Sequence, residues 1–376
     1  MRITQGATRT RGGLHSFSDT LAQWFPVPRI LTPPAAGIDI SDASIKWFAF
    51  DPRGRDRHVH AYGELPLPEG AVEGGVVRDV QTLARALATV KDELGGITAA
   101  HAALPEEGAY VFSMHVPPGT SREQTLKIIE FEFEGRVPIP PSAAVYDYYR
   151  IPTTTASEEE IAVEVFPRDI AVEYATAFDV AGITLLSLEI EARSIARAVT
   201  TGESDEPITL IVDFGRERTG FAVVKRGIPI FTSTVDVGGN TITRMLMEKM
   251  SLGFEEAENY KSAEGLIASS VPSKGVEAIS GTASALADEI ARHYHYWDTR
   301  RNEHGERMTP VGRVLLVGGN VNLRGLAGYI SSRVQAPTER GDVWKRVASF
   351  DDYIPPIDRK QSYQYATAIG LALRGK

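Results

Sequence analysis

Cysteine is the most informative absence from this sequence. None of the 376 residues is a cysteine, so the chain can form neither a disulfide nor a thiolate metal site. No apolar run approaches the roughly 20 residues that a membrane-spanning helix needs. The N-terminal stretch contains basic residues but lacks the continuous apolar segment of a secretory signal. We therefore expect a cytoplasmic protein.

An excess of basic residues is also missing. Lysine and arginine total 40 against 49 aspartates and glutamates, which gives a formal net charge of −9. Nucleic-acid-binding proteins usually concentrate positive charge, so we expect no nucleic-acid partner. The length of 376 residues and the hydrophobic content of 43% are sufficient for two domains, each with its own core.

The stretch at residues 210–224 is the feature around which the rest of the sequence is arranged. An apolar run brings Asp213 to the end of a strand, Gly215 permits a tight turn, and a second apolar run returns as a hairpin. A carboxylate beside a loop of backbone amides can hold a divalent cation and a phosphate together. Residues 36–50 repeat this design, with Asp39 in the place of Asp213. Two such hairpins indicate an internally duplicated domain.

Residues 111–183 have a different character from their surroundings. Their pattern predicts the order strand, helix, strand, strand, helix, strand, and Ser121 with Gln124 forms a capping box for the first helix. This βαββαβ order predicts a small two-layer module, at about residues 100–183, inserted into the first half. Elsewhere the pattern predicts a loop over 266–276 and helices over 76–94, 193–200, 241–250, 254–263, 279–301, 326–334 and 363–373.

These elements predict an organisation in four parts: an N-terminal arm (1–35), a first half (36–205) that includes the inserted module, a second half (206–360) with a small subdomain at about 240–280, and a C-terminal helix (361–376) packed back on the first half. Two interpretations of the arm are open. It packs on the domain surface, or it forms a short membrane-surface foot with Leu21, Trp24 and Phe25.

Five segments have the order and spacing of the actin, Hsp70 and sugar-kinase superfamily: GIDISDASIK, LIVDFGRERTGF, VGGN, LLVGGNVNLRGL and YATAIGLAL. Within it, residues 36–376 resemble the PilM family of type IV pilus assembly proteins, which is related to the cell-division protein FtsA. VDVGGNTITRML followed by LGFEEAENYK, the segment VPIPPSAAVYDYYRI and the inserted module carry this closer resemblance. It implies an α/β, duplicated actin-like (ribonuclease H-like) ATPase fold.

The resemblance implies that ATP and Mg²⁺ lie in a cleft between the halves, and that the small subdomain at about 240–280 caps the nucleotide. Asp39 and Asp213 would hold the magnesium ion through water, because Mg²⁺ keeps several waters and touches few carboxylates. Lys46 would reach the β-phosphate. The other implied nucleotide-binding residues are Ser41, Asp42, Ala43 and Ser44 in the first turn, Gly215, Arg216 and Thr219 in the second, Gly238, Gly239 and Asn240 near the γ-phosphate, and Glu258, Lys261, Gly318, Gly319, Asn320 and Leu323 around the adenosine.

Several of these residues also have ordinary structural explanations. A single strand-end aspartate is common in turns, and Gly318 with Gly319 would suit a simple strand-to-helix turn. Glu258 and Lys261, one helical turn apart, could form only a surface ion pair.

The two phosphate-binding turns depart from the superfamily pattern. Ser41 stands where glycine is usual, and Arg216, Glu217 and Arg218 stand where small hydroxyl residues are common. Hydrolysis further needs a group that orients water in line with the γ-phosphate, and Asp236 is a candidate whose location the sequence does not give. We expect ATP binding with slow hydrolysis or none, and we assign no catalytic residue.

The function implied by the resemblance is a nucleotide-binding scaffold at the inner face of the cytoplasmic membrane. It would serve a type IV pilus or a related type II secretion assembly platform and bind the cytoplasmic N-terminal peptide of a PilN-like membrane protein at the inserted module and its border with the first half. Other platform proteins, the pilus motor ATPases and self-association are further candidates. The alternatives are an FtsA-like filament, which would end in an amphipathic membrane-targeting helix, and a small-molecule kinase, for which the sequence offers no catalytic base.

Overall fold

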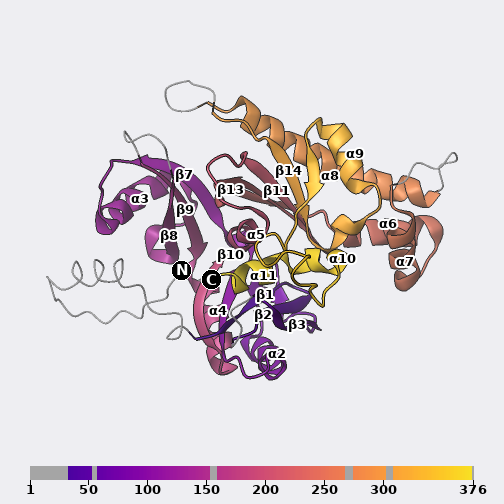
Figure 1. The fold of residues 1–376 in the computed structure, drawn as a ribbon, viewed down its shortest axis with the longest axis horizontal. Coiled ribbons are helices and arrows are strands. Elements are labelled where there is room, and N and C mark those ends of the chain that lie inside the picture. Colours follow the sequence, from indigo (N-terminus) through magenta and orange to yellow (C-terminus); the bar gives the residue numbers. More distant parts are fainter. Residues whose placement is uncertain (1–32, 53–56, 153–158, 267–273, 302–307, 375–376) are drawn as a thin grey trace.

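The computed structural model describes residues 33–52, 57–152, 159–266, 274–301 and 308–374. The predicted N-terminal arm lies outside the described residues as far as residue 32, and so does most of the loop predicted at 266–276. The described strands form two five-stranded sheets, one three-stranded sheet and one two-stranded ribbon of β4 (Val72–Glu73) and β5 (Val76–Val77) (Figure 1). Within the same part of the chain, no helix has the length and apolar character needed to cross a bilayer.

The first five-stranded sheet has the strand order β10 (Thr184–Ile190), β6 (Ala99–Leu104), β1 (Ala35–Ile40), β2 (Ser44–Phe50) and β3 (Val59–Pro66). β1 is antiparallel to β2 and parallel to β6, which is parallel to β10. Helices α2 (Val80–Glu93) and α4 (Arg168–Val180) pack together on this sheet. α2 starts later than predicted because the side chain of Asp79 caps it by accepting two backbone amides.

The second five-stranded sheet repeats this topology, as the duplicated hairpins predict. Its order is β13 (Ile228–Val235), β12 (Thr219–Lys225), β11 (Thr209–Phe214), β14 (Arg313–Val317) and β15 (Thr338–Arg340). β11 is antiparallel to β12 and parallel to β14, just as β1 is to β2 and β6. The largest hydrophobic core joins this sheet to α6 (Gly239–Met250), α7 (Phe254–Glu264), α8 (Lys274–Thr299) and α9 (Leu326–Val334).

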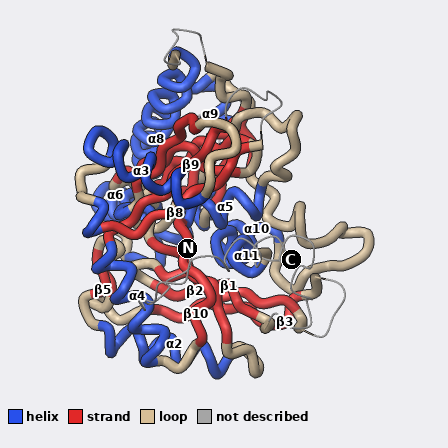
Figure 2. The backbone as a smooth tube through the Cα atoms, turned by 90° about the vertical axis from the view of Figure 1, so that its left-hand side faces the viewer, coloured by secondary structure: helices blue, strands red, loops and turns tan. Residues whose placement is uncertain are grey.

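Helices α5 (Glu191–Val199) and α11 (Ala366–Ala372) lie between the two large sheets (Figure 2). Their side chains share one core with apolar residues from β2, β11, β12 and β14. The packing is close enough to require glycine: a Cβ on Gly37 would lie 2.0 Å from the carbonyl oxygen of Ala368, and one on Gly370 would lie 1.8 Å from that of Ser194. The two helices therefore connect the halves through a shared interior.

The inserted module is smaller than predicted. It contains β7 (Tyr110–Val116), α3 (Arg122–Arg136), β8 (Ala144–Ile151) and β9 (Glu159–Pro167), with the sheet order β7-β9-β8 and its own core. The predicted capping box of Ser121 and Gln124 is present. The predicted βαββαβ elements are present in that order, but the last helix and strand were wrongly assigned to the module, because α4 packs on the first large sheet and β10 pairs in it. The limit at about residue 100 was also wrong, because β6 pairs in the same large sheet. The separate module is βαββ.

Candidate functional site

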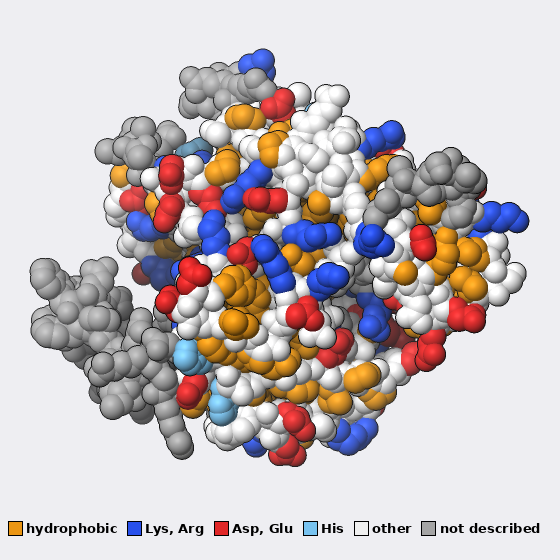
Figure 3. Space-filling model, turned by 45° about the vertical axis from the view of Figure 1, so that its right-hand side comes forward, with side chains coloured by type: hydrophobic (Ala, Val, Ile, Leu, Met, Phe, Trp, Pro, Cys, Tyr) orange, Lys and Arg blue, Asp and Glu red, His pale blue; other side chains and the backbone are white. Residues whose placement is uncertain are grey.

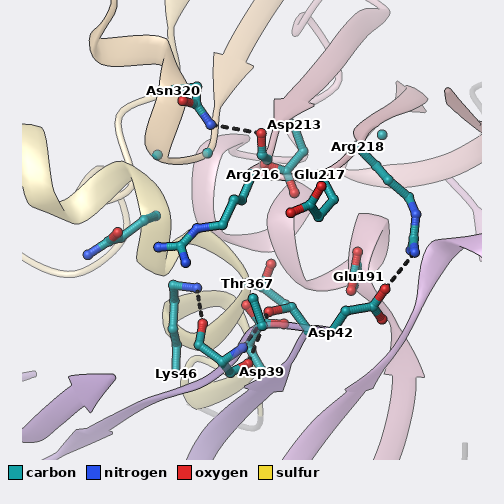
Figure 4. Close-up of a pocket in the computed structure, with 18 of the residues that line it drawn as sticks. Asp39, Asp42, Lys46, Glu191, Asp213, Arg216, Glu217, Arg218, Asn320 and Thr367 are labelled. Carbon is teal, nitrogen blue, oxygen red and sulfur yellow. Dashed lines mark hydrogen bonds and ion pairs between the residues drawn. The ribbon is translucent and has the colours of Figure 1, made fainter. Parts of the chain in front are cut away.

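A cavity of about 460 Å³ lies between the two halves and is drawn in Figure 4. It opens where β1, β6, β10 and β11 end, and in sheets with parallel strands this carboxyl edge is the usual place for a ligand. The cavity brings together residues from both hairpins, from α6 and α7, and from the loop after β14. The predicted site residues that line it are Asp39, Ser41, Asp42, Ala43, Ser44, Lys46, Asp213, Gly215, Arg216, Asn240, Glu258, Lys261, Gly318, Gly319 and Asn320.

Four predicted residues do not line this cavity: Thr219, Gly238, Gly239 and Leu323. Thr219 is fully buried behind the second turn, where its hydroxyl donates to the carbonyl oxygen of Val237 at 2.5 Å. Leu323 lines a second, adjoining cavity. These four residues can support the site from behind, but they do not line the cavity that contains the paired aspartates.

The glycines of the second half allow three loops to pack together. A Cβ on Gly238 would lie 2.4 Å from the carbonyl oxygen of Arg216, and one on Gly239 would lie 2.1 Å from Oδ1 of Asn320. The Gly239 amide donates to the carbonyl oxygen of Gly215 at 3.0 Å, and Nδ2 of Asn320 donates to the same oxygen at 2.7 Å. These contacts fix the second phosphate-binding turn from behind.

The first turn uses two of its own amides internally. The Ser41 amide donates to the carbonyl oxygen of Ser44 at 2.9 Å, and the Ser44 amide donates to Oγ of Ser41 at 3.2 Å. The serine that replaces the usual glycine therefore closes the turn with its own hydroxyl. Of the four amides expected to meet phosphate, those of Asp42 and Ala43 are the ones that this turn leaves for a ligand.

Asp39 and Asp213 both have raised pKa values, and burial is the main cause for each. Burial raises the pKa of Asp39 to about 6, although the ammonium of Lys46 lowers it. Burial and the charge of Asp39 raise the pKa of Asp213 to about 6. Each carboxylate therefore loses hydration on folding, and the two are close enough to repel one another.

This pair suits a hydrated divalent cation. A cation would relieve the repulsion between Asp39 and Asp213, which burial leaves poorly compensated. Among the described residues, no group of three or more acidic or histidine side chains is arranged to coordinate a metal directly. Mg²⁺ keeps most of its water and is commonly bound through one or two carboxylates together with substrate phosphates, so the donor set fits it.

The sequence analysis missed four glutamates that line the cavity: Glu64, Glu106, Glu107 and Glu191. Two of them, Glu106 and Glu191, have raised pKa values. Glu106 is 7% exposed, and its Oε1 atom has no hydrogen-bond partner among the described residues. Burial raises its pKa to about 7. Burial and the charge of Asp39 raise the pKa of Glu191 well above its usual range. Both residues follow parallel strands of the first sheet, β6 and β10, so a correct assignment of those strands would have found them.

Lys46 is held in place on the first hairpin. Its ammonium lies 3.0 Å from Oγ of Ser44 and 3.3 Å from a carboxylate oxygen of Glu64, and it stands directly opposite Asp39 in the β1–β2 ladder. Glu64 in turn accepts a hydrogen bond from Ser44 at 2.8 Å. The lysine is thus part of a fixed group at the cavity wall.

Glu258 and Lys261 are more than an exposed pair on one helix. Lys261 is 7% exposed, and its ammonium lies 2.6 Å from Glu258, 3.0 Å from the hydroxyl of Thr243 and 3.4 Å from the carbonyl oxygen of Gly239. These contacts join α7 to the start of α6. Both members of the pair line the cavity, so they are positioned for contact with a ligand.

Asp236 lies outside the cavity lining, and its side chain is 97% exposed. It is therefore a poor candidate for orienting water at a buried phosphate.

The adjoining second cavity, of about 1090 Å³, contributes a basic rim to the site: Arg324, Arg340, Arg359 and Lys360. In Figure 3, lysine and arginine side chains gather over the middle of one face of the molecule.

Solved structures with a similar fold include the following three. A PilM-PilN type IV pilus biogenesis complex aligns with a TM-score of 0.75 at 20% identity, over 93% of this chain and 99% of that chain. The ethanolamine utilization protein EutJ from Carboxydothermus hydrogenoformans aligns with a TM-score of 0.52 at 19% identity, over 93% and 92%. MreB 5 of Spiroplasma citri bound to AMPPNP aligns with a TM-score of 0.50 at 12% identity, over 90% and 95%.

These likenesses establish the actin-like ATPase fold that the two hairpins predict. The sequence itself matches the family described as Type IV pilus assembly protein PilM over residues 37–376, which leaves only the N-terminal arm outside. With the fold and the family match in agreement, the chain belongs to the PilM family of type IV pilus assembly proteins.

Proposed function

We propose that the chain is an ATP-binding scaffold of the inner-membrane assembly platform of a type IV pilus or a related type II secretion system. The observation that carries the proposal is the pair Asp39 and Asp213, which two copies of one hairpin contribute to a single cavity. Their raised pKa values and mutual repulsion favour a bound cation. The MreB 5 structure bound to AMPPNP shows that a protein of this fold holds a nucleotide.

In the proposed complex, Asp39 and Asp213 hold Mg²⁺ through water, and the ion neutralises phosphate charge. The free amides of both turns and the ammonium of Lys46 bind the phosphate groups, because backbone amides and lysine together form an anion site. The adenosine lies toward the second cavity, between the loop at Gly318–Asn320 and the pair Glu258 and Lys261. The exposed Asp236 leaves hydrolysis without an assigned residue, so we propose binding with slow turnover or none.

Calorimetric titration tests this site directly. ATP should bind to the full chain, and Mg²⁺ should increase the affinity because it offsets the charge of the paired aspartates. ADP and AMPPNP should bind to the same site and compete with ATP. A chain that binds ATP no better with Mg²⁺ than without it would contradict the metal assignment, and a chain that binds no nucleotide would contradict the proposed function.

The proposed partner is the cytoplasmic N-terminal peptide of a PilN-like membrane protein, since the most similar fold reported above comes from a PilM-PilN complex. The border between the inserted module and the rest of the chain is the candidate region. The guanidinium of Arg193 on α5 lies 4.2 Å from the ring centre of Tyr149 on β8, and the ammonium of Lys225 lies 2.5 Å from Glu160 on β9. Charged and aromatic contacts of this kind can rearrange when a peptide binds. Other platform proteins, the pilus motor ATPases and self-association remain candidate interactions.

ATP would act on this border by favouring one arrangement of the two halves. Such a shift requires that the peptide and ATP each bind one arrangement better than the other, and the coupling must be reciprocal. Peptide affinity should therefore change by the same factor on adding ATP as ATP affinity changes on adding peptide. Equal peptide affinity with and without ATP and Mg²⁺ would contradict the proposed coupling. Sedimentation with ATP distinguishes this scaffold from a filament-forming FtsA-like protein.

A further inference from the structure

Arg218 spans the cavity from one half of the molecule to the other. It lies in the turn between β11 and β12, and its Nη2 atom is 2.7 Å from Oδ2 of Asp42 in the first hairpin turn. Its Nη1 atom pairs with Glu107, which lies in a short 3₁₀ turn, η2 (Glu106–Gly108), just before β7. Its Nε atom is 3.7 Å from Asp236. One guanidinium thus joins the second half to two loops of the first.

These groups stand where phosphate is proposed to bind. Asp42, Glu107 and Arg218 all line the cavity that holds Asp39 and Asp213. Their side chains are 24%, 25% and 23% exposed, so a ligand in the cavity can reach them. An arginine fork binds carboxylates and phosphates with the same two-point geometry. A terminal phosphate and the two carboxylates therefore compete for one guanidinium.

The two carboxylates differ in what holds them once Arg218 is withdrawn. Asp42 also accepts hydrogen bonds from the amides of Gly74 and Gly75, at 2.9 and 3.0 Å, and these would keep it in place. Glu107 has Arg218 as its ion-pair partner in the described part of the chain. Loss of that partner therefore acts mainly on Glu107 and on the turn that carries it.

The turn η2 packs against the inserted module and leads directly into its first strand. A Cβ on Gly108 would lie 2.8 Å from the ring of Phe166, a residue of the central strand β9, so the turn lies directly against the module's sheet. Two residues after Gly108 the chain enters β7, which pairs with β9. A shift of η2 would therefore change contacts of both strands.

We propose that Arg218 senses the terminal phosphate of the bound nucleotide. A triphosphate takes the guanidinium from Asp42 and Glu107, and the freed η2 turn transmits this exchange to the inserted module. A diphosphate ends short of the guanidinium and leaves the ion pairs intact. This inference rests on the proposed nucleotide site and names the residue that would make it responsive to the third phosphate.

The proposed exchange predicts that substitutions of Arg218 and Glu107 change ATP affinity in opposite directions. Arg218→Ala should weaken Mg·ATP binding about tenfold and Mg·ADP binding about twofold or less, since the lost contact is a charge-assisted hydrogen bond at a partly exposed site. Glu107→Gln should strengthen Mg·ATP binding about threefold, because it removes a competitor for the guanidinium. In the Arg218→Ala background, Glu107→Gln should lose this gain and change ATP affinity no more than a general change of charge does.

Glu217→Gln is the matched control for a general change of charge. Glu217 lines the same cavity but accepts its hydrogen bond from Asn240. Its substitution should change ATP affinity equally with and without Arg218. The inference is overturned if Glu107→Gln has the same effect in both backgrounds, or if Arg218→Ala weakens ATP and ADP equally. Failure of the unaltered chain to bind either nucleotide overturns the proposed function itself, and this inference with it.

A measurement on the unaltered chain covers the case in which Arg218→Ala does not fold. Amide hydrogen exchange at residues 106–112 reports local opening of η2 and the start of β7. Exchange there should be faster with Mg·AMPPNP than with Mg·ADP, at saturating concentrations of both. Identical exchange in the two complexes overturns the inference.

Discussion

The two hairpins of the cavity have one architecture and different charge partners. Asp39 and Asp213 are each the second-last residue of their strand, and each is paired across an antiparallel ladder. Opposite Asp39 stands Lys46, whereas opposite Asp213 stands Gly220. The first hairpin therefore carries its own counter-charge, whereas Asp213 in the second is compensated by Lys46 of the first and, in the proposed complex, by the bound cation. The two hairpins thus share the aspartate, whereas a lysine stands opposite it only in the first hairpin.

Asp213 has no charged residue opposite it in its hairpin, so its substitution should have the largest effect. Asp213→Asn should lower Mg·ATP affinity by roughly 10–100-fold, the range expected when a group that orients metal ligands is lost. It should also raise the melting temperature of the nucleotide-free protein, because a buried charge with a raised pKa is removed. Calorimetric titration and a thermal melt measure the two effects.

Asp39→Asn is the matched variant in the first hairpin. It should weaken Mg·ATP binding to a similar degree, but it leaves Lys46 without its opposing carboxylate, so Mg²⁺-free ATP should bind more tightly than to Asp213→Asn. If both variants keep the full effect of Mg²⁺ on ATP affinity, the paired aspartates do not hold the metal.

Gly318 packs closely against the side chain of Asp213. Gly318 has a φ of +93°, and a Cβ there would lie 2.4 Å from Oδ1 of Asp213. Gly318→Ala should therefore lower the free energy of unfolding by about 1–3 kcal/mol or more. Gly328→Ala on α9 is the control, since a Cβ there meets nothing within 4 Å and should increase the free energy of unfolding by up to about 1 kcal/mol. Denaturant titration checks both, and equal effects would contradict the proposed crowding.

Lys46→Met makes the first hairpin resemble the second. Both aspartates should then become harder to ionise, since the charge of Lys46 lowers the pKa of each. ATP affinity should fall about tenfold through loss of a charged phosphate contact. Lys225→Met, which removes a lysine of the second hairpin that pairs with Glu160 outside the cavity, should leave ATP affinity unchanged. Equal losses in the two variants would show that general charge, not position, decides the affinity.

The smallest effect should come from pH. Because burial raises both aspartate pKa values to about 6, each carboxylate is about half protonated at pH 6. Mg²⁺ affinity should therefore fall about fourfold between pH 7.5 and pH 6, as protons compete for both groups. An affinity that is constant over this interval would contradict the raised values.

Stability of the metal-free protein should change with pH in the opposite sense to metal binding. The raised pKa values favour the folded state fully below the ordinary aspartate pKa of 3.8, and this contribution is lost as pH rises through about 6. The pair should thus make the metal-free protein less stable at pH 7.5 than at pH 5.5, and Asp213→Asn should reduce that difference. Denaturant titrations at the two pH values measure it.

The sequence was sufficient to predict the parts of the fold that depend on local pattern. The two hairpins, the capping box of α3 and most helices follow from apolar periodicity and turn residues, and the paired hairpins locate Asp39 and Asp213. The limits of the inserted module do not follow from such patterns. β6 pairs with β1, and β10 pairs with β6, through parallel pairing of distant segments, and a strand's sequence does not say which sheet it joins.

The same long-range pairing explains what was missed at the site. Glu106 and Glu191 follow β6 and β10, so they come beside Asp39 only after the sheet has formed. Arg218 stood out in the sequence as a departure from the superfamily, but its partners Asp42 and Glu107 lie in the other half of the chain. The local chemistry of a turn can be read from its residues, whereas contacts across a cleft require the tertiary structure.

The position of α11 has a consequence for synthesis of the protein on the ribosome. Its residues 366–372 pack against β1, which begins at residue 35, and a core that includes both sheets requires this late helix. Domains usually fold as they emerge, starting from the N-terminal side. Here the first half emerges hundreds of residues before α11, so its apolar surface around Gly37 stays exposed to chaperones or to other nascent chains until residues 366–372 have been synthesised.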